Sequence, residues 1–218
     1  MKIQTPDSTA LIRLLAVGVL AVIATPVLAD DDYSLVPDDF IYCTTCHGVE
    51  LRGNVSVDAP RLNGMEGWYL KNQMLSFKQG HRGTHPEDLI GMEMQPQAEA
   101  LSEEQIEDVV AFVTALPVRT ETIEHTIEGD ADRGKSLYAT CGACHGMGGE
   151  GNKMMNAPAL AGQSDWYLVR QLEKYQAGAR GYDSADIFGQ QMKAATAVLT
   201  SEEDVQDVVA YINTLEVN

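Results

Sequence analysis

Long alternating runs of β-branched residues, the pattern of a half-buried strand, are absent from this 218-residue chain. Basic residues are also few, since 15 Lys and Arg stand against 32 Asp and Glu and the net charge is −17. Such acidity disfavours nucleic acid and anionic lipid as partners and favours proteins that present basic docking surfaces. The sequence therefore predicts helical structure and excludes partners with dense negative charge.

Apolar runs of about 20 residues, the length of a membrane span, are absent beyond the first 29 positions. Residues 1–29 combine a basic start, an apolar run over 14–24 and small residues at 27–29. This pattern is typical of a secretory signal peptide cleaved after Ala29, with an uncleaved membrane anchor as the alternative. We therefore expect an exported protein whose mature part is soluble.

Cysteine occurs only four times, in two Cys-x-x-Cys pairs that are each followed directly by His. The motifs are Cys43-Thr44-Thr45-Cys46-His47 and Cys141-Gly142-Ala143-Cys144-His145. This spacing puts two thiols on one side of a helical turn, where they can bind the vinyl groups of a haem while the His ligates iron. Thioredoxin-like pairs, zinc sites and short disulfides do not explain the repeated His. The motifs predict two haem c groups, attached through Cys43, Cys46, Cys141 and Cys144.

The chain repeats itself at an offset of 98 positions. The matches include the two Cys-x-x-Cys-His motifs, Ala59-Pro60 with Ala157-Pro158, Trp68-Tyr69-Leu70 with Trp166-Tyr167-Leu168, and Met94 with Met192. A constant register of this kind indicates two copies of one domain. We place the first domain at 30–117, a linker at 118–129 and the second domain at 130–218. Each copy is too short to bury much apolar surface alone, and a flat apolar cofactor would supply the missing core.

Apolar residues at helical spacing predict a helix at the end of each copy, over 106–116 and 205–215. Ser102 with Gln105 has the spacing of a capping box, and Ser201 begins the second helix in the same way. Both copies should therefore end in amphipathic helices that pack on their own domain.

Further helices are expected over 68–77 and 166–175, and over 132–140 leading into the second motif. The equivalent helix before the first motif should start later and be shorter, because Pro37 stands in it. The linker lacks a helical apolar stripe and should be an extended strap. The predicted fold class is all-α, with two tandem domains related by internal duplication.

The five histidines are not placed to ligate both faces of two haems symmetrically. Only five are present, and His47 and His145 are the proximal candidates. His81 and His85 have no equivalents in the second copy, and His125 lies in the linker. A symmetric bis-His arrangement is therefore excluded.

Methionine provides the better sixth ligand. Met94 and Met192 stand at the shared offset of 98, and a thioether suits haem iron and raises its reduction potential. Packing in the core is the alternative role for both. Met92 competes with Met94, but its counterpart Gln190 could not serve as ligand. We therefore predict His47 with Met94 and His145 with Met192 as axial pairs.

Two more equivalent pairs have roles that the sequence leaves open. Pro60 and Pro158 each hold either a loop whose carbonyl accepts the ring N–H of the proximal His, or an ordinary turn. Arg82 and Arg180 either bind haem propionates, because guanidinium matches carboxylate, or lie exposed on the surface.

The stretches Trp166–Leu172 and Gly189–Met192, set after Cys141–Gly146, resemble the dihaem cytochrome c4 family. Met94-Gln95-Pro96 is similar to the Met-x-Pro form of the axial loop in that family. The resemblance covers nearly all of the chain after the leader. It implies two class I cytochrome c folds in tandem, and a periplasmic electron carrier that often delivers electrons to a terminal oxidase. The first domain departs from the pattern through Pro37, which affects how its haem crevice is closed.

Three kinds of function fit two haems. The leading hypothesis is electron transfer between redox partners by a carrier that is not an enzyme, because both irons would be six-coordinate. The second is a cytochrome subunit of a redox enzyme, such as a flavoprotein sulfide dehydrogenase. Under either hypothesis, we expect any association with a membrane to be through a partner. The third, catalysis by the chain itself, requires an unusual ligand at one iron, and the paired Met argue against it.

Overall fold

The computed structural model describes residues 40–118, 123 and 125–217. The predicted leader at 1–29 and its cleavage site lie outside these residues. All described residues belong to one compact unit. Apart from two isolated bridges, Asn54 with Ala59 and Asn152 with Ala157, this part of the chain contains helices and loops and no strand. The prediction of an all-α fold is confirmed.

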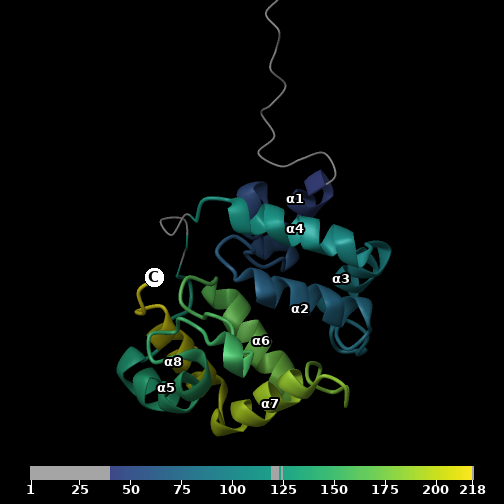
Figure 1. Cartoon of the computed structure of the whole chain (residues 1–218). Helices are drawn as coiled ribbons and strands as arrows, with labels where there is room; N and C mark the ends of the chain where they lie inside the picture. The colour runs from purple at the N-terminus through teal and green to yellow at the C-terminus, as the bar shows by residue number, and fades with distance from the viewer. Residues whose placement is uncertain (1–39, 119–122, 124, 218) are drawn as a thin grey trace, which may run out of the picture. The chain divides into compact units, whose positions relative to one another are not determined.

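The four α-helices of each half follow in the same order, which Figure 1 displays along the colour gradient. The first half contains the α-helices α1 (Ile41–His47), α2 (Gly67–Lys78), α3 (Leu89–Ala100) and α4 (Glu103–Ala115). Two short 3₁₀ helices, η2 (Val49–Leu51) and η3 (Val55–Val57), lie between α1 and α2. The second contains α5 (Ala131–His145), η5 (Lys153–Met155), α6 (Asp165–Ala177), α7 (Ile187–Ala195), η6 (Thr196–Val198) and α8 (Glu202–Ile212). The helices predicted from the sequence correspond to α2, α4, α5, α6 and α8.

Both predicted helix starts at the domain ends are confirmed. The Ser102 side chain accepts a hydrogen bond from the Gln105 N–H, and the Gln105 side chain accepts one from the Ser102 N–H. Ser201 and Asp204 form the same reciprocal pair at the start of α8. Each capping box satisfies donors that the first helical turn leaves without an internal partner.

Helices α3 and α7, by contrast, were not predicted from the sequence. The resemblance at Met94-Gln95-Pro96 implies a loop, but these residues lie inside α3. Gly91 and Pro96 are poor helix formers and mask the helix in the sequence. The helix forms because Asp88 caps its start, accepting from the Gly91 N–H, and because Met, Gln, Glu and Ala fill most other positions.

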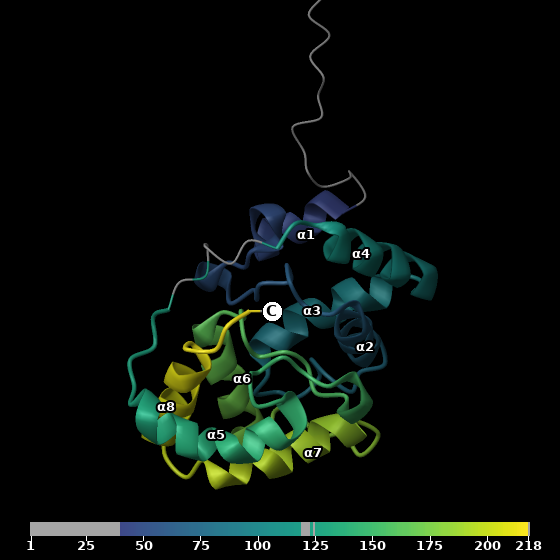
Figure 2. The ribbon, with the colours of Figure 1, turned by 60° about the vertical axis from the view of Figure 1, so that its left-hand side comes forward.

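The two domain cores differ in size. In the second half α5 packs against α8, as Figures 1 and 2 both show, and α6 also contacts α8. Their core contains Tyr138, Leu168, Leu199, Val205, Val208, Val209 and Ile212. In the first half α2 contacts α3 and α4. The core there is a smaller buried set, Leu51, Leu70 and Val113. None of the helices in the described ranges has the length and hydrophobicity of a transmembrane span.

Candidate haem sites

Both Cys-x-x-Cys-His motifs lie at the C-terminal end of a helix. The helix α1 ends at His47 and α5 ends at His145, and a glycine with positive φ follows each. The two imidazoles are buried, with 5% and 6% of their surfaces exposed. The cysteines are only partly buried or exposed, and none of the four forms a disulfide. Each motif thus presents two free thiols beside one buried ring.

A backbone carbonyl fixes the tautomer of each ring. Nδ1 of His47 lies 2.8 Å from the Pro60 carbonyl oxygen, and Nδ1 of His145 lies 2.7 Å from that of Pro158. A carbonyl only accepts, so each Nδ1 carries the hydrogen and donates it. The Nε2 lone pair is then directed away from the loop, as a metal ligand requires. The loop role that the sequence left open for the two prolines is confirmed.

Burial further favours the neutral form of both rings. It lowers the pKa of His47 and of His145, although the hydrogen bonds to Pro60 and Pro158 act in the opposite direction. A neutral imidazole is the form that ligates iron. The protein itself therefore favours the neutral, metal-binding form of both rings.

The loop between each His and its proline is held by a close approach of backbone. The N–H of Gly53 donates to the His47 carbonyl, and that of Gly151 to the His145 carbonyl, both at 2.8 Å. Gly53 has φ +92°, and a Cβ there would lie 2.7 Å from the Arg61 nitrogen. Gly151 has φ +82°, and its Cβ would lie 2.5 Å from the Ala159 nitrogen. Only glycine fits these positions, which explains why both copies carry it.

A cavity of about 490 Å³ joins all four predicted residues of the second site: Cys141, Cys144, His145 and Met192 line it. Apolar side chains of α6, including Leu168 and Leu172, supply much of the remaining wall. First-half residues such as Met65 and Tyr69 complete it. Its size and lining are those of a cofactor site. Met94 and His47 of the first site lie outside this lining, on α3 and α1.

The two candidate methionines have similar surroundings. Met94 in α3 and Met192 in α7 are both half-buried, whereas 45% of the Met92 surface is exposed. Residues two apart on a helix face nearly opposite directions, so Met92 and Met94 could not both point into the domain. Of the two, Met94 has the burial of its counterpart Met192.

Two buried arginines lack a carboxylate partner. Arg82 and Arg180 are 8% and 5% exposed, and neither forms an ion pair with any described residue. Nη1 of Arg82 donates to Gln73 Oε1 at 2.7 Å, and Nη1 of Arg180 donates to Gln171 Oε1 at 2.7 Å. The Arg82 Nε is buried without a partner. Surface exposure, one of the two roles considered from the sequence, is wrong for both.

These arginines also link the halves. Nη2 of Arg82 donates a hydrogen bond to Gln171 Oε1 at 3.2 Å, and Nη2 of Arg180 donates one to Gln73 Oε1 at 3.1 Å. Burial raises the pKa of the neighbouring Tyr167 phenol, but the charges of Arg82 and Arg180 outweigh it and lower that pKa below its ordinary value. Two buried cations without an ion pair are costly, and a pair of carboxylates would give them ion-pair partners. We name Arg82, Arg180, Gln73 and Gln171 the arginine–glutamine cluster.

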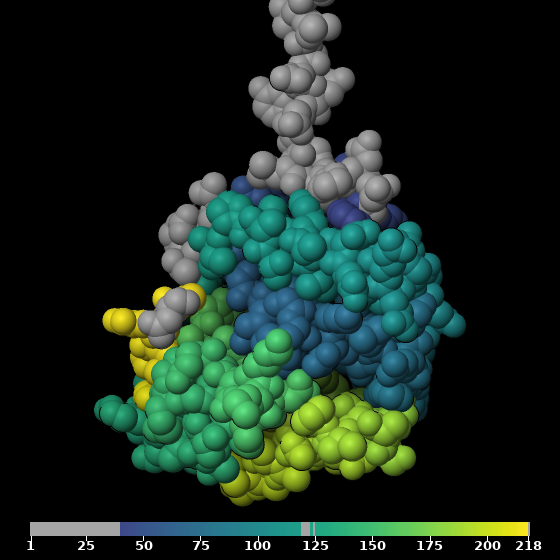
Figure 3. Space-filling view, viewed as in Figure 1, coloured from purple at the N-terminus to yellow at the C-terminus, as the bar shows by residue number. Residues whose placement is uncertain are grey.

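Contacts between the halves follow an approximate twofold relation. Thr84 and Tyr182, which are equivalents of each other, touch through their hydroxyls. Asn72 donates to Asn156 at 3.0 Å, and their equivalents Arg170 and Asp58 form an ion pair. Figure 3 shows the blue surface of the first half against the green surface of the second. Equivalent positions of the two halves thus face each other across the contact.

The remaining histidines do not gather into a metal site. His81 lines the cavity, and the ring of His85 lies 5.1 Å from that of Tyr182. No group of three or more His, Cys, Asp or Glu in the described part of the chain is placed to hold a metal ion. The chemistry therefore concentrates at the two Cys-x-x-Cys-His motifs.

The residues present fit a haem at each motif. The thiols suit the vinyl groups, the neutral Nε2 suits iron, and the unpaired cations of the arginine–glutamine cluster suit propionates. When bound, a haem supplies a one-electron couple. The protein's own part is to orient the imidazole through a proline carbonyl, to bury the ring and to provide positive charge. Gln73 and Gln171 were not singled out as functional from the sequence, although they are equivalents at the offset of 98 that relates the two copies.

Comparisons with known proteins agree with this arrangement. The cytochrome c family model matches residues 40–117 and 131–216. A thiosulfate dehydrogenase electron acceptor of Stutzerimonas stutzeri is 35% identical over 178 residues, which are 78% of this chain and 76% of the relative. The two matched regions confirm the tandem fold.

Two solved structures are similar to this one. Reduced cytochrome c4 from Pseudomonas stutzeri has a TM-score of 0.63 and 25% identity, over 82% of this chain and 95% of that chain. The thiosulfate dehydrogenase TsdBA from Marichromatium purpuratum has a TM-score of 0.63 and 30% identity, over 80% of this chain. The present chain spans only 36% of that protein. The predictions of two haem c groups and of an electron carrier rather than an enzyme are confirmed. The chain belongs to the cytochrome c family, as a dihaem member of the cytochrome c4 type.

Proposed function

We propose that this chain is a periplasmic dihaem electron carrier that accepts electrons from a dehydrogenase and passes them toward a terminal oxidase or reductase. One haem is bound by Cys43 and Cys46 with His47 and Met94 as axial ligands. The other is bound by Cys141 and Cys144 with His145 and Met192. The observation that carries the proposal is the cavity in which all four residues of the second set meet. With two protein ligands on each iron, no coordination position is left for a substrate.

The ligand set is tested by spectroelectrochemical titration of the mature dihaem protein, following the methionine–iron absorption band. We expect two methionine-ligated haems at positive potential. Met94→Ala and Met192→Ala should each lower the potential of one haem and remove about half of the band, with both haems still attached through their cysteines. Met92→Ala is the matched control. An unchanged spectrum in Met94→Ala, with band loss in Met92→Ala, would show that Met92 is the ligand.

Relatives favour a thiosulfate dehydrogenase as the electron donor. The Stutzerimonas stutzeri relative is named as the electron acceptor of such an enzyme, and the similar Marichromatium purpuratum structure is itself a thiosulfate dehydrogenase. The test is stopped-flow reduction of the oxidised protein by a purified thiosulfate dehydrogenase with thiosulfate. Fast reduction of both haems is expected. Reduction no faster than by thiosulfate alone would remove this donor.

A second candidate is a permanent cytochrome subunit of the same kind of enzyme, because the chain matches one part of a longer thiosulfate dehydrogenase. The two candidates differ in how long the partners stay together. A carrier elutes separately from the dehydrogenase in size-exclusion chromatography at cellular salt, whereas a subunit elutes with it. Co-elution at equal amounts would favour the subunit and count against the carrier.

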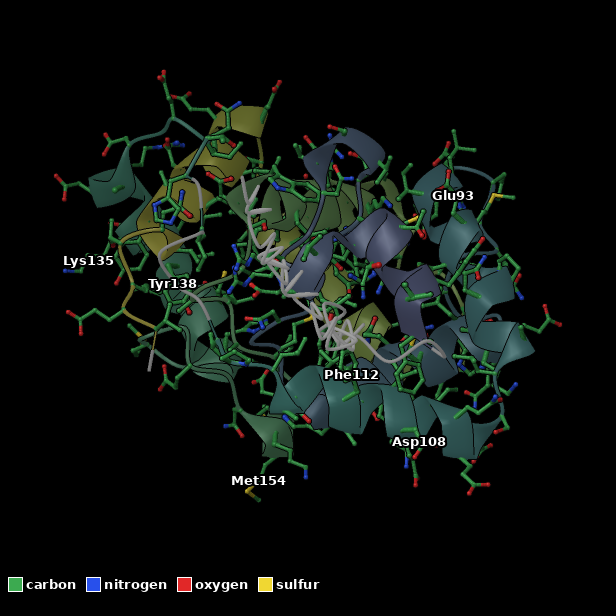
Figure 4. All side chains as sticks on the ribbon, turned by 90° about the horizontal axis from the view of Figure 1, so that it is seen from above. Glu93, Asp108, Phe112, Lys135, Tyr138 and Met154 are labelled. Carbon is green, nitrogen blue, oxygen red and sulfur yellow. The ribbon has the colours of Figure 1, made fainter. Side chains whose placement is uncertain are left out.

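The acidic surface supports partners with basic docking surfaces. Exposed acidic side chains such as Glu93 and Asp108 point away from the molecule in Figure 4, and the whole chain has a net charge of −17. Association should therefore slow as salt screens the attraction, over a Debye length of about 8 Å at physiological ionic strength.

Export is proposed to use residues 1–29, with domains at 30–117 and 130–218. The mass of the protein recovered from the periplasm tests cleavage after Ala29.

A further inference from the structure

Asp88 is a fully buried carboxylate at the start of the helix that carries Met94. None of its surface is exposed, and Oδ1 accepts from the Gly91 N–H at 3.1 Å as the N-cap of α3. The fit is tight, because a Cβ on Gly91 would lie 2.0 Å from Asp88 Oδ2. The position of this carboxylate therefore determines where α3 begins, and with it the placement of Met94 in the second turn.

The charge that balances Asp88 comes from the other half of the chain. Nζ of Lys174, in α6, donates to Asp88 Oδ1 at 2.6 Å, and the Lys174 side chain is only 18% exposed. The second oxygen, Oδ2, is buried without a hydrogen-bond partner. Burial raises the pKa of Asp88, but the hydrogen bond and charge of Lys174, with the more distant charge of Arg82, outweigh it and lower that pKa. Asp88 thus remains ionised chiefly because of Lys174, a residue in the second domain.

No equivalent of this ion pair occurs in the described part of the second domain. Asp186 caps α7 in the same way, accepting from the Gly189 N–H at 2.8 Å. Asp186 is only half-buried, and no ion pair with it occurs among the described residues. The position equivalent to Lys174 is Ser76, which has no charge. The contact between a capping carboxylate and the opposite domain is therefore present for one methionine helix only.

We propose that Lys174 is a positioning residue for the first haem: its ion pair with Asp88 holds the start of α3 so that Met94 stays on the iron. This rests on the proposed ligand pair His47 and Met94. Removing Lys174 leaves a buried carboxylate without its nearest counter-charge, which favours protonation of the group or its movement toward water. Either response loosens the cap and the first turn of α3. Through this contact, the second domain maintains the ligation of the haem in the first.

The test compares Lys174→Met with Lys71→Met in the mature dihaem protein. Lys71 is a matched control, because it forms an exposed ion pair with Glu107 and its loss removes the same charge. We expect Lys174→Met to lose up to about half of the total methionine–iron band, since one of two haems is affected, and to lower one potential. Lys71→Met should keep the band. An intact band in Lys174→Met, with both potentials shifted equally, would overturn the proposal by showing a general charge effect.

A double variant separates positioning from misfolding. Asp88→Asn keeps a good N-cap and removes the buried charge, so adding it to Lys174→Met should restore the band. Failure to restore it contradicts a role through Asp88. Met94→Ala distinguishes this inference from the ligand set on which it rests. If Met94→Ala removes one haem's band while Lys174→Met leaves both, the ligand set stands and the role of Lys174 falls. If Met94→Ala leaves both bands, the ligand set itself falls.

Discussion

Replacement of Gly134 by Ala tests the close packing of α5 on α8, which supports the second haem motif. Gly134 is buried in α5, three turns before His145. A Cβ at this position would lie 1.9 Å from the Asp207 carbonyl oxygen and 3.0 Å from the Tyr211 Cβ. The nearer obstacle is backbone of α8, which cannot turn aside as a side chain could. The two helices must therefore separate to admit a methyl group.

The magnitude follows from two opposing effects. Alanine is the better helix former by about 1 kcal/mol. Real Cβ contacts stay above 3.0 Å, so an approach of 1.9 Å requires a displacement of about 1.1 Å. A gap of about 0.5–1 Å already forfeits a quarter to a half of the dispersion attraction between packed atoms. Tyr138, Val208 and Val209, all nearly or fully buried, would lose contact. We expect a net loss of about 2 kcal/mol in the free energy of unfolding, within the range for overpacked cores.

Thermal unfolding of the dihaem protein measures this loss. For a domain of this size, about 2 kcal/mol corresponds to a midpoint lower by roughly 10 °C. Gly67→Ala in α2 is the control, because a Cβ there meets only the side chains of Thr114 and Val110, at 3.1 Å and 3.2 Å. Small side-chain shifts relieve such contacts, so the control should change little. A Gly134→Ala protein as stable as the parent, or more stable, would refute the argument for close helix packing.

Two further predictions concern the same domain. Hydrogen bonds from the Thr200 N–H and hydroxyl, with Arg133, hold the pKa of Asp204 at about 2, below its ordinary 3.8. Because the folded-state pKa is depressed, the stabilisation is complete above 3.8 and is lost as pH falls toward 2. A plot of thermal midpoint against pH should therefore be flatter in this range for Asp204→Asn, and an identical slope would contradict the assignment. Tyr138→Phe removes the hydroxyl that donates to the Gly146 carbonyl at 2.8 Å. It should lower the free energy of unfolding by about 1–2 kcal/mol in urea, and no change would mean that the carbonyl finds another donor.

Most of the fold could be predicted because its signals are local or repeated. Apolar spacing defines α4 and α8, and the capping boxes at Ser102 and Ser201 define where they begin. The constant offset of 98 then transfers each observation from one half to the other. Helices α3 and α7 escaped prediction because Gly and Pro lower helix propensity, while the compensating Asp caps act through hydrogen bonds at their starts.

The sequence also predicts attachment and proximal ligation at each motif, since both depend on adjacent residues. It does not predict the contacts across the two halves. Arg82 meets Gln171 only because both domains fold and then pack, and Lys174 meets Asp88 for the same reason. No spacing rule reaches over such separations. The offset of 98 pairs Arg82 with Arg180 and Gln73 with Gln171, but it pairs Lys174 with the uncharged Ser76, so Lys174 carried no signal.

The structure gives a physical reason why the two haem sites should differ. In the second domain the helix before the motif spans Ala131–His145, and Arg133 ties it to Asp204 and Asp207 of α8. In the described part of the first domain, α1 spans only Ile41–His47. No ion pair from α1 to α4 occurs among the described residues, and Phe40 stacks on Phe112 instead.

A shorter helix, with fewer charged contacts among the described residues, restrains His47, the proposed proximal ligand, less, and the first core is also the smaller one. The Lys174–Asp88 ion pair acts on this weaker side, where the cap of the methionine helix depends on the opposite domain. Disturbing the packing between the domains should therefore change the first haem before the second. The potential of the first haem is then the more sensitive of the two to a partner that binds across both domains.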